Sequence, residues 1–162
     1  MEQSEVKKWL KKDHKTEIAG AAERLSGVIK PTPLIKSDHY SADYGCDIWL
    51  KPENLQVTGS FKIRGAYNKI ASLEKSELKR GIISASAGNH AQGVAFSAER
   101  RGIIATIVMP GITPLLKVEA TRAYGAEVIL YGDAYDESFE RAKEISVQKN
   151  KTFILFLTKS TR

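Results

Sequence analysis

Short apolar runs alternate with longer amphipathic stretches from about residue 47 onward. The apolar runs predict strands at 47–51, 82–85, 103–109 and 127–131, with a last candidate at 152–157. The stretches between them predict helices at 60–73, from the turn 86–89 to 101, at 113–125 and at 135–148. Strand–helix–strand repetition with apolar strands is typical of a parallel sheet covered by helices. The fold class we expect is therefore α/β.

Local signals sharpen the helix boundaries. Thr113 followed by Pro114 predicts an N-cap with proline at the first helical position, and Gly125 suits a left-handed helix end. In parallel sheets of this kind, ligands bind beyond the carboxyl ends of the strands, where loops enter helices. That rule indicates the turn 86–89 and the loop before Ser60 as candidate binding regions.

Composition narrows the class of protein. A hydrophobic fraction of 42% and a charged fraction of 27% are those of a soluble globular protein, and no apolar run could span a bilayer. The single cysteine, Cys46, excludes an internal disulfide framework, favours the reducing cytoplasm and is expected to be buried. The net charge of +6 comes from dispersed lysines and arginines apart from one cluster at 7–15, without interleaved aromatics, which argues against nucleic-acid binding.

Lys62 is the first candidate for chemistry. It follows the expected cap Ser60 by two residues, so the positive end of the helix dipole opposes its ammonium form and favours the nucleophilic amine. Phe61 beside it offers a ring face for a flat cofactor. Most lysines in a first helical turn are solvated surface residues, and the local pattern leaves that interpretation open.

The second candidate is the turn after the strand at 82–85. Its small residues let the backbone approach a ligand closely, and amides at the following helix start favour an anion such as a carboxylate. Asn89 can donate a hydrogen bond without carrying charge. The segment can also be interpreted as an ordinary turn in which Ser86 or Asn89 caps the helix and His90 is a packed supporting residue. The sequence leaves both interpretations open. The sequence has no HxxxH, CxxC or carboxylate cluster, so we expect no transition-metal site.

Five segments in order resemble the serine/threonine dehydratase branch (threonine ammonia-lyase) of the fold-type II pyridoxal-phosphate enzymes. These segments are Pro31-Thr32-Pro33-Leu34, Lys51-Pro52-Glu53-Asn54-Leu55-Gln56, 59–66 (GSFKIRGA), 86–93 (SAGNHAQG) and 117–126 (KVEA through YGA). The resemblance covers about 19–154 and implies an incomplete tryptophan synthase β-subunit-like fold. It divides the chain into an N-terminal extension at 1–15, the first segment of a larger domain at 16–58, a smaller parallel α/β domain at 59–157 and a non-family tail at 155–162.

The resemblance also implies roles for the candidate residues. Lys62 would bind pyridoxal 5'-phosphate covalently and then exchange protons, Phe61 would pack near its ring, and Asn89 would bond its phenolic oxygen. The implied reaction removes the α-proton and the β-hydroxyl of L-threonine or L-serine and gives a 2-oxo acid and ammonia. Related serine racemases carry a serine base where this chain has Ala87, so dehydration is favoured over racemisation. The segment that would receive the substrate carboxylate is Ser86, Ala87, Gly88, Asn89 and His90.

The resembling family has chains about twice as long, and its full-length members are expected to be homo-oligomers. Its glycine-rich phosphate loop, the polar partner of the pyridine nitrogen and most of the larger domain would follow later. After Ile154 the sequence leaves the family pattern, so we hypothesise a frameshifted or truncated product with little dehydratase activity by itself. The alternatives are a serine racemase-like enzyme, or a non-catalytic fragment that binds a partner through an exposed half-core.

Overall fold

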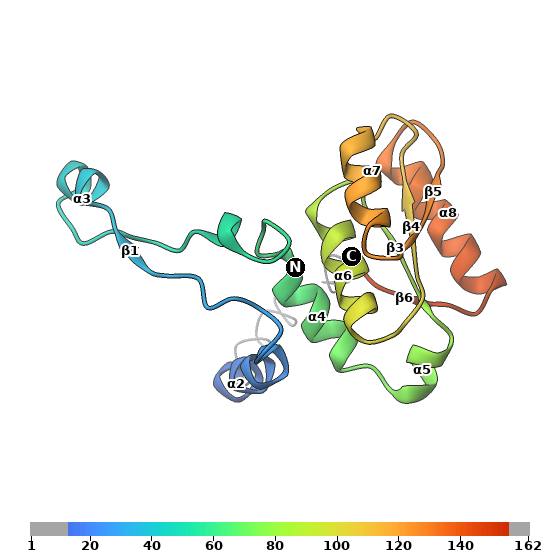
Figure 1. Ribbon diagram of the computed structural model, residues 1–162, viewed down its shortest axis with the longest axis horizontal. Coiled ribbons are helices and arrows are strands. Elements are labelled where there is room, and N and C mark those ends of the chain that lie inside the picture. Colours follow the sequence, from blue (N-terminus) through green and yellow to red (C-terminus); the bar gives the residue numbers. More distant parts are fainter. Residues whose placement is uncertain (1–12, 156–162) are drawn as a thin grey trace, which may run out of the picture.

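The computed structural model describes residues 13–155 (Figure 1). The first part of the chain runs through α2 (His14–Leu25), β1 (Ile35–Lys36), α3 (Asp38–Tyr44), β2 (Trp49–Leu50) and the short 3-10 helix η1 (Glu53–Leu55). The second part contains α4 (Lys62–Ala71), α5 (Lys75–Lys79), β3 (Ile82–Ala85), α6 (Asn89–Arg100), β4 (Ala105–Met109), α7 (Leu115–Arg122), β5 (Glu127–Leu130), α8 (Tyr135–Gln148) and β6 (Thr152–Phe153).

A four-stranded sheet in the order β5-β4-β3-β6 forms the centre of the second part, and all its neighbouring strands are parallel. The predicted α/β class with a parallel sheet flanked by helices is confirmed. Every residue of β3 and β4 is buried, as expected for central strands covered on both faces. The chain builds outward from β3 to β5 and then returns to the other side of β3. This reversal creates a topological switch point between β3 and β6.

Alternate residues of the central strands face two different helical layers. Ile82 and Ile107 belong to the larger core cluster, which includes side chains of α4, α6 and α7. Ile83 and Val108 belong to the smaller cluster with side chains of α8. Figure 1 shows α6 and α7 on one side of the sheet and α8 on the other, with α4 beside α6. α4, which carries Lys62, lies beside α6, which begins with Asn89. The packing between these two helices therefore sets where the two candidate residues lie.

Residues 34–50, which we call the arm, extend away from this body (Figure 1). β1 and β2 pair antiparallel, with Ile35 opposite Leu50, and no residue of α3 is buried. The strand predicted at 47–51 therefore lies in a separate two-stranded ladder, shortened to its central residues. Cys46 is exposed, and the expectation of a buried cysteine is wrong because the segment between α3 and β2 contributes nothing to a core.

Of the two predicted boundaries of the helix at 113–125, the start needs correction and the end is confirmed. α7 begins at Leu115, and Pro114 occupies the cap position with a ψ of 133°. The Pro114 carbonyl accepts the amides of Lys117 and Val118 at 2.9 and 3.3 Å, so the predicted cap, Thr113, lies one residue too early. A proline ring fixes φ but leaves ψ to packing, so the sequence signal could not separate the two positions. Gly125 has a φ of +73°, which confirms the left-handed end that its sequence predicted.

The final predicted strand at 152–157 is shorter, since β6 ends at Phe153, and α5 has no counterpart among the predicted helices. α2 begins at His14, where the Asp13 carboxylate accepts the Thr16 amide, so the last two residues of the expected extension are helical. Residues 1–12 of that extension and residues 156–162 of the non-family tail lie outside the described residues. Within 13–155, no helix has the length and apolar character needed to cross a membrane.

Candidate functional site

The turn after β3 lies at the switch point, where sheets of this type bind ligands. The Ser86 amide donates to the Val108 carbonyl at 3.1 Å, and the Ser86 hydroxyl accepts the Gly88 amide at 3.3 Å. Gly88 is the cap residue of α6, and the helix begins at Asn89, whose side chain is exposed. Neither Asn89 nor Ser86 is therefore the cap residue, and Asn89 is placed at the first helical position next to the turn.

Lys62 is the first residue of α4, and Phe61 occupies the cap position. The Ser60 hydroxyl accepts the Lys62 amide at 3.4 Å, so the serine contributes a long capping bond one residue before the cap itself. The Lys62 ammonium lies 4.1 Å from the centroid of the Phe61 ring. Phe61 is 56% exposed, which leaves most of an aromatic surface in solvent beside the lysine. An exposed ring next to a reachable amine suits a flat, aldehyde-bearing ligand.

His90 connects the lysine to the end of the sheet. It is buried in the first turn of α6, and burial lowers its pKa from 6.5 to about 4, with the positive charge of Lys62 acting in the same direction. A hydrogen bond to the backbone of Ile154 opposes that shift. His90 is therefore a neutral imidazole at pH 7. Its sequence allowed both a ligand-facing and a supporting role, and its burial favours the supporting one.

The end of β6 is tied to the same region. The Ile154 carbonyl accepts the buried Ser84 hydroxyl at 2.7 Å, and the Ile154 amide donates to the Ile83 carbonyl at 2.8 Å. Ser84 belongs to β3, immediately before the turn that holds Asn89. The switch point is thus closed by direct bonds between the two strands that flank it.

A cluster of polar side chains, which we call the clamp, joins Thr32 and Glu53 to Arg64 of α4. Thr32 and Glu53 lie just before and just after the arm and form what we call its root. The clamp was not predicted from the sequence. Arg64 donates two hydrogen bonds of 2.7 Å to the two Glu53 carboxylate oxygens, and the Thr32 hydroxyl donates to Glu53 at 2.5 Å. The bonds from Arg64 lower the pKa of Glu53 from 4.5 to about 2. A possible sequence signal was the oppositely charged pair Glu53 and Arg64 within the family-like segments. The clamp fixes the first turn of α4, which carries Lys62.

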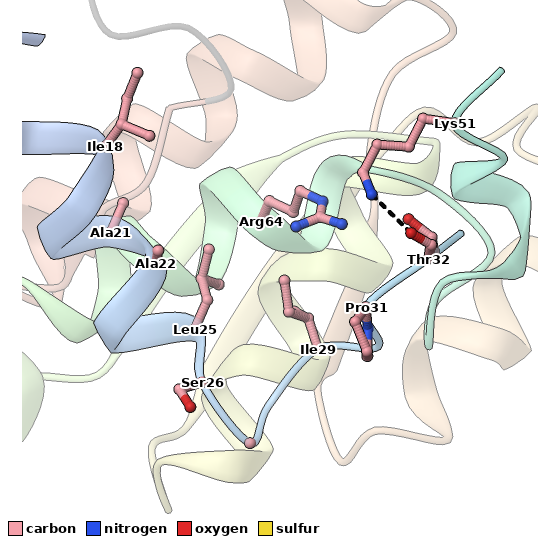
Figure 2. A pocket seen from close by; sticks show the side chains of 11 residues that line it. Ile18, Ala21, Ala22, Leu25, Ser26, Ile29, Pro31, Thr32, Lys51 and Arg64 are labelled. Carbon is pink, nitrogen blue, oxygen red and sulfur yellow. Dashed lines mark hydrogen bonds between the residues drawn. The ribbon is translucent and has the colours of Figure 1, made fainter. Parts of the chain in front are cut away.

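A groove of about 660 Å³ opens beside this clamp (Figure 2). One wall comes from the apolar face of α2, and the opposite end holds Lys51, which donates to the Thr32 carbonyl at 2.9 Å, with Arg64 lying between the two. Neither Lys62 nor Asn89 lines it. The groove is therefore separate from the two candidate regions predicted from the sequence, Lys62 and the turn at 86–89, which we call the asparagine turn. Within the described part of the chain, no group of three or more His, Cys, Asp and Glu residues could hold a metal ion.

Comparison with known proteins decides the family. A profile described as "Pyridoxal-phosphate dependent enzyme" matches residues 25–156. The chain belongs to this family. The match contains every candidate residue, from Phe61 and Lys62 to the turn at 86–90, and the pyridoxal-phosphate cofactor that the sequence predicted is confirmed at the level of the family.

Individual relatives agree with this assignment. An L-threonine ammonia-lyase of Thermotoga maritima is 52% identical over 138 residues, which are 85% of this chain and 34% of the relative. Among solved structures, threonine deaminase isoform 2 of Solanum lycopersicum matches with a TM-score of 0.80 and 38% identity over 91% of this chain and 42% of that one. Serine racemase of Dictyostelium discoideum matches with a TM-score of 0.82 and 31% identity, over 89% of this chain and 47% of the racemase. The chain spans about a third of the length of several curated relatives that it matches.

The geometry of the site fits such a cofactor. Lys62 is partly exposed, and an added Cβ at Gly59, before α4, or at Gly88, before α6, would meet nothing within 4 Å, so the backbone is open at both of these turns. Asn89 presents an exposed amide, and Phe61 presents an exposed ring. These groups supply a covalent attachment point, a polar contact and an apolar surface, which are the three needs of an aromatic aldehyde with a phenolic oxygen.

Proposed function

We propose that this chain carries the cofactor-binding lysine and the carboxylate-binding turn of a threonine or serine ammonia-lyase. The observation that carries the proposal is the position of Lys62 at the start of α4, with its ammonium over the exposed Phe61 ring and its charge acting on His90 after the asparagine turn. The reaction would convert L-threonine or L-serine to a 2-oxo acid and ammonia. When bound, pyridoxal phosphate supplies an electron sink for the carbanion at the substrate α-carbon.

The Lys62 amine would perform two tasks. Its Nζ would attach to the cofactor aldehyde and, once the substrate amine has displaced it, would accept the substrate α-proton, while the β-hydroxyl takes up a proton and leaves as water. The neutral His90 supports both tasks because it brings no second positive charge into the buried region beside the lysine. Phe61 would contact the cofactor ring from the side where its own ring is exposed. The Asn89 amide would donate to the phenolic oxygen without changing the charge of the site.

The turn from Ser86 to His90 would bind the substrate carboxylate. Backbone amides at the start of a helix favour an anion, and α6 begins at Asn89. Ala87 has no group that can carry a proton, which favours elimination from one face over the two-sided proton transfer of a racemase. A serine racemase-like activity is the competing proposal, and a chiral assay of the recovered substrate separates the two.

The domain division, compartment and assembly belong to the same proposal. We propose that residues 59–157 form a smaller domain and residues 16–58 begin a larger one, supported by the absence of buried residues in α3, β1 and β2. A cytoplasmic location is supported by the single exposed thiol of Cys46. A homo-oligomeric state is proposed for the full-length enzyme, with a free amino acid as substrate.

The direct test is cofactor capture by the full chain. Pyridoxal phosphate is titrated into the protein, the visible absorption band is recorded, and borohydride reduction followed by peptide mass spectrometry locates the modified lysine. We expect Lys62 to be modified and the band to disappear in Lys62→Ala. The matched control is Lys69→Ala, which removes an exposed lysine two turns later on α4 and should leave the band unchanged.

Modification spread over many lysines, or a band that survives in Lys62→Ala, would contradict the proposal. Release of 2-oxobutyrate from threonine is measured on the same samples. Release at typical enzymatic rates by the chain alone would contradict the expectation of low activity stated from the sequence.

The arm supports a second candidate function, the binding of a partner polypeptide without catalysis. Leu34, Ile35, Trp49 and Leu50 are 61%, 49%, 52% and 44% exposed, so the ladder presents apolar side chains to solvent. Exposed apolar patches are typical of interaction surfaces. Size-exclusion chromatography of the chain with and without a full-length relative tests this candidate. Co-elution together with absent cofactor capture would favour it over the lyase.

A further inference from the structure

Gly93 lies in α6, one helical turn after Asn89, and is buried against α4. A Cβ built on Gly93 would lie 3.3 Å from the carbonyl carbon of Lys62, 3.3 Å from the amide nitrogen of Ile63 and 3.4 Å from the Cβ of Ala66. Two of these neighbours are backbone atoms, which cannot swing aside as the end of a long side chain can. The backbone at Lys62 therefore packs directly against the backbone of α6 at Gly93, with no side chain between them.

The surroundings of this contact leave little room for adjustment. Ile63 in α4 and Ala91 and Val94 in α6, which flank the contact in sequence, are all 0% exposed. Protein interiors are close-packed, so an added methyl group forces its neighbours to move. Glycine inside a helix also destabilises the helix relative to alanine, so its presence here needs a packing reason.

We propose that Gly93 is a positioning residue for Lys62. The missing side chain at Gly93 sets how closely α4 approaches α6, and this approach fixes the spacing between the Lys62 amine and Asn89, one turn earlier on the same helix. The inference deepens the proposed function and rests on it for its catalytic meaning. Its geometric part concerns this chain alone: a Cβ at position 93 requires the backbone at Lys62 and Ile63 to shift by a few tenths of an ångström.

The test compares two identical substitutions in the full chain, Gly93→Ala and Gly65→Ala. Gly65 lies in α4, three residues after Lys62, and an added Cβ there would meet nothing within 4 Å. Both variants gain the helix propensity of alanine, and only Gly93→Ala adds an atom to the contact between α4 and α6. Far-ultraviolet circular dichroism and thermal unfolding establish that each variant is folded.

The first readout needs no cofactor. Lysines of the cofactor-free protein are acetylated with a trace of acetic anhydride, and mass spectrometry gives the labelling rate of Lys62 relative to Lys69. We expect Gly93→Ala to raise the relative rate of Lys62 several-fold, because the methyl group pushes the first turn of α4 outward. Gly65→Ala should leave it at the wild-type value. An unchanged Lys62 rate in folded Gly93→Ala overturns the inference.

The second readout is the capture of pyridoxal phosphate. Displacement of Lys62 relative to Asn89 should weaken capture about tenfold in Gly93→Ala and should change the circular dichroism of the cofactor band. If wild-type protein captures no cofactor, the proposed function fails and the labelling result still decides the inference. If capture and labelling in Gly93→Ala both match wild type, the inference fails and the proposed function stands.

A second variant covers the case in which Gly93→Ala does not fold. The double variant Gly93→Ala/Ala66→Gly adds the same methyl group and removes one of its three close neighbours. The backbone contact with Lys62 remains in it, so the labelling rate of Lys62 should still rise. Failure of both variants to fold would assign Gly93 to core stability rather than to the lysine and would overturn the inference.

Discussion

The body of this protein, which comprises α4 to β6, and the arm at 34–50 differ in how much of their secondary structure is buried. In the body, every residue of β3 and β4 is buried, and helices cover both faces of the sheet. In the arm, every residue of β1 and β2 is exposed, and α3 buries nothing. The family-like segments lie in the body and on either side of the arm, and only Leu34 belongs to the arm itself. The candidate site residues lie in the body, where Lys62 begins α4 and Asn89 begins α6.

The root of the arm shows what the other family-like residues do. Thr32 and Glu53 come from the segments before the body, and both bond within the clamp that includes Arg64 of α4. Arg64 follows Lys62 by two residues, so the clamp holds the same helical turn whose backbone lies against Gly93. The residues on either side of the arm therefore help to hold Lys62 in place through the clamp. The arm itself buries no residue of β1, α3 or β2, so the body does not stabilise it.

The largest expected effect is in the central strand. Ile107 is 0% exposed in β4, and Ile107→Ala should lower the free energy of unfolding by about 2–5 kcal/mol, because it removes buried methyl groups and leaves a cavity. Urea denaturation monitored by circular dichroism measures the loss. The control is Ile104→Ala, since Ile104 is 69% exposed just before the same strand and should cost about 0.5 kcal/mol or less. Equal losses in the two variants would break the contrast on which the body is defined.

The body was predictable from sequence because its signals reinforce one another. Continuous apolar runs such as that of β4 stand between helices with clear turns, and the parallel arrangement follows from their alternation. The arm offers a weaker signal: an apolar run predicted a strand at 47–51, but the two strands are two residues each and their apolar side chains face solvent. Pairing between residues 35 and 50 depends on tertiary geometry rather than on local periodicity.

The candidate site was predictable in part. The strand-end rule and the family resemblance both selected the turn that contains Asn89, and the structure puts that turn at the switch point of the sheet. Three contacts could not be derived from the sequence: the contact between Gly93 and the Lys62 backbone, the bonds to Ile154, and the clamp around Glu53, of which only the opposite charges of Glu53 and Arg64 were visible. Each depends on segments that are distant in the chain and close in space.

An intermediate effect is expected at the clamp that joins the two regions. Glu53→Gln should speed hydrogen exchange in peptides covering residues 30–56 about tenfold at pH 7, because charge-assisted bonds to Arg64 contribute about 1.5–3 kcal/mol before solvent screening. The folded pKa of Glu53 is depressed from 4.5 to about 2, so its stabilisation is present above pH 4.5 and is lost as pH falls toward 2. The difference between wild type and Glu53→Gln should therefore shrink across that window.

The matched control for the clamp is Glu140→Gln on α8. Glu140 pairs with Lys143 at 2.7 Å, and both side chains are at least half exposed. An exposed pair of this kind contributes about 0–1 kcal/mol, so exchange in residues 30–56 should not change. A Glu53→Gln effect that is no larger than the Glu140→Gln effect, or that persists unchanged at pH 3, would show that the clamp does not hold the arm root.

The smallest effect is expected in the arm itself. Trp49 is 52% exposed in β2, and its ladder partner is Lys36, so Trp49→Ser should change the free energy of unfolding by less than about 0.5 kcal/mol. Urea denaturation at two protein concentrations tenfold apart provides the measurement, with Ile107→Ala as the reference for a buried position. A concentration-dependent loss greater than about 1 kcal/mol would show that association buries the Trp49 ring. The contrast between body and arm would then hold for the isolated chain only, because a second copy would supply the layer that the arm lacks.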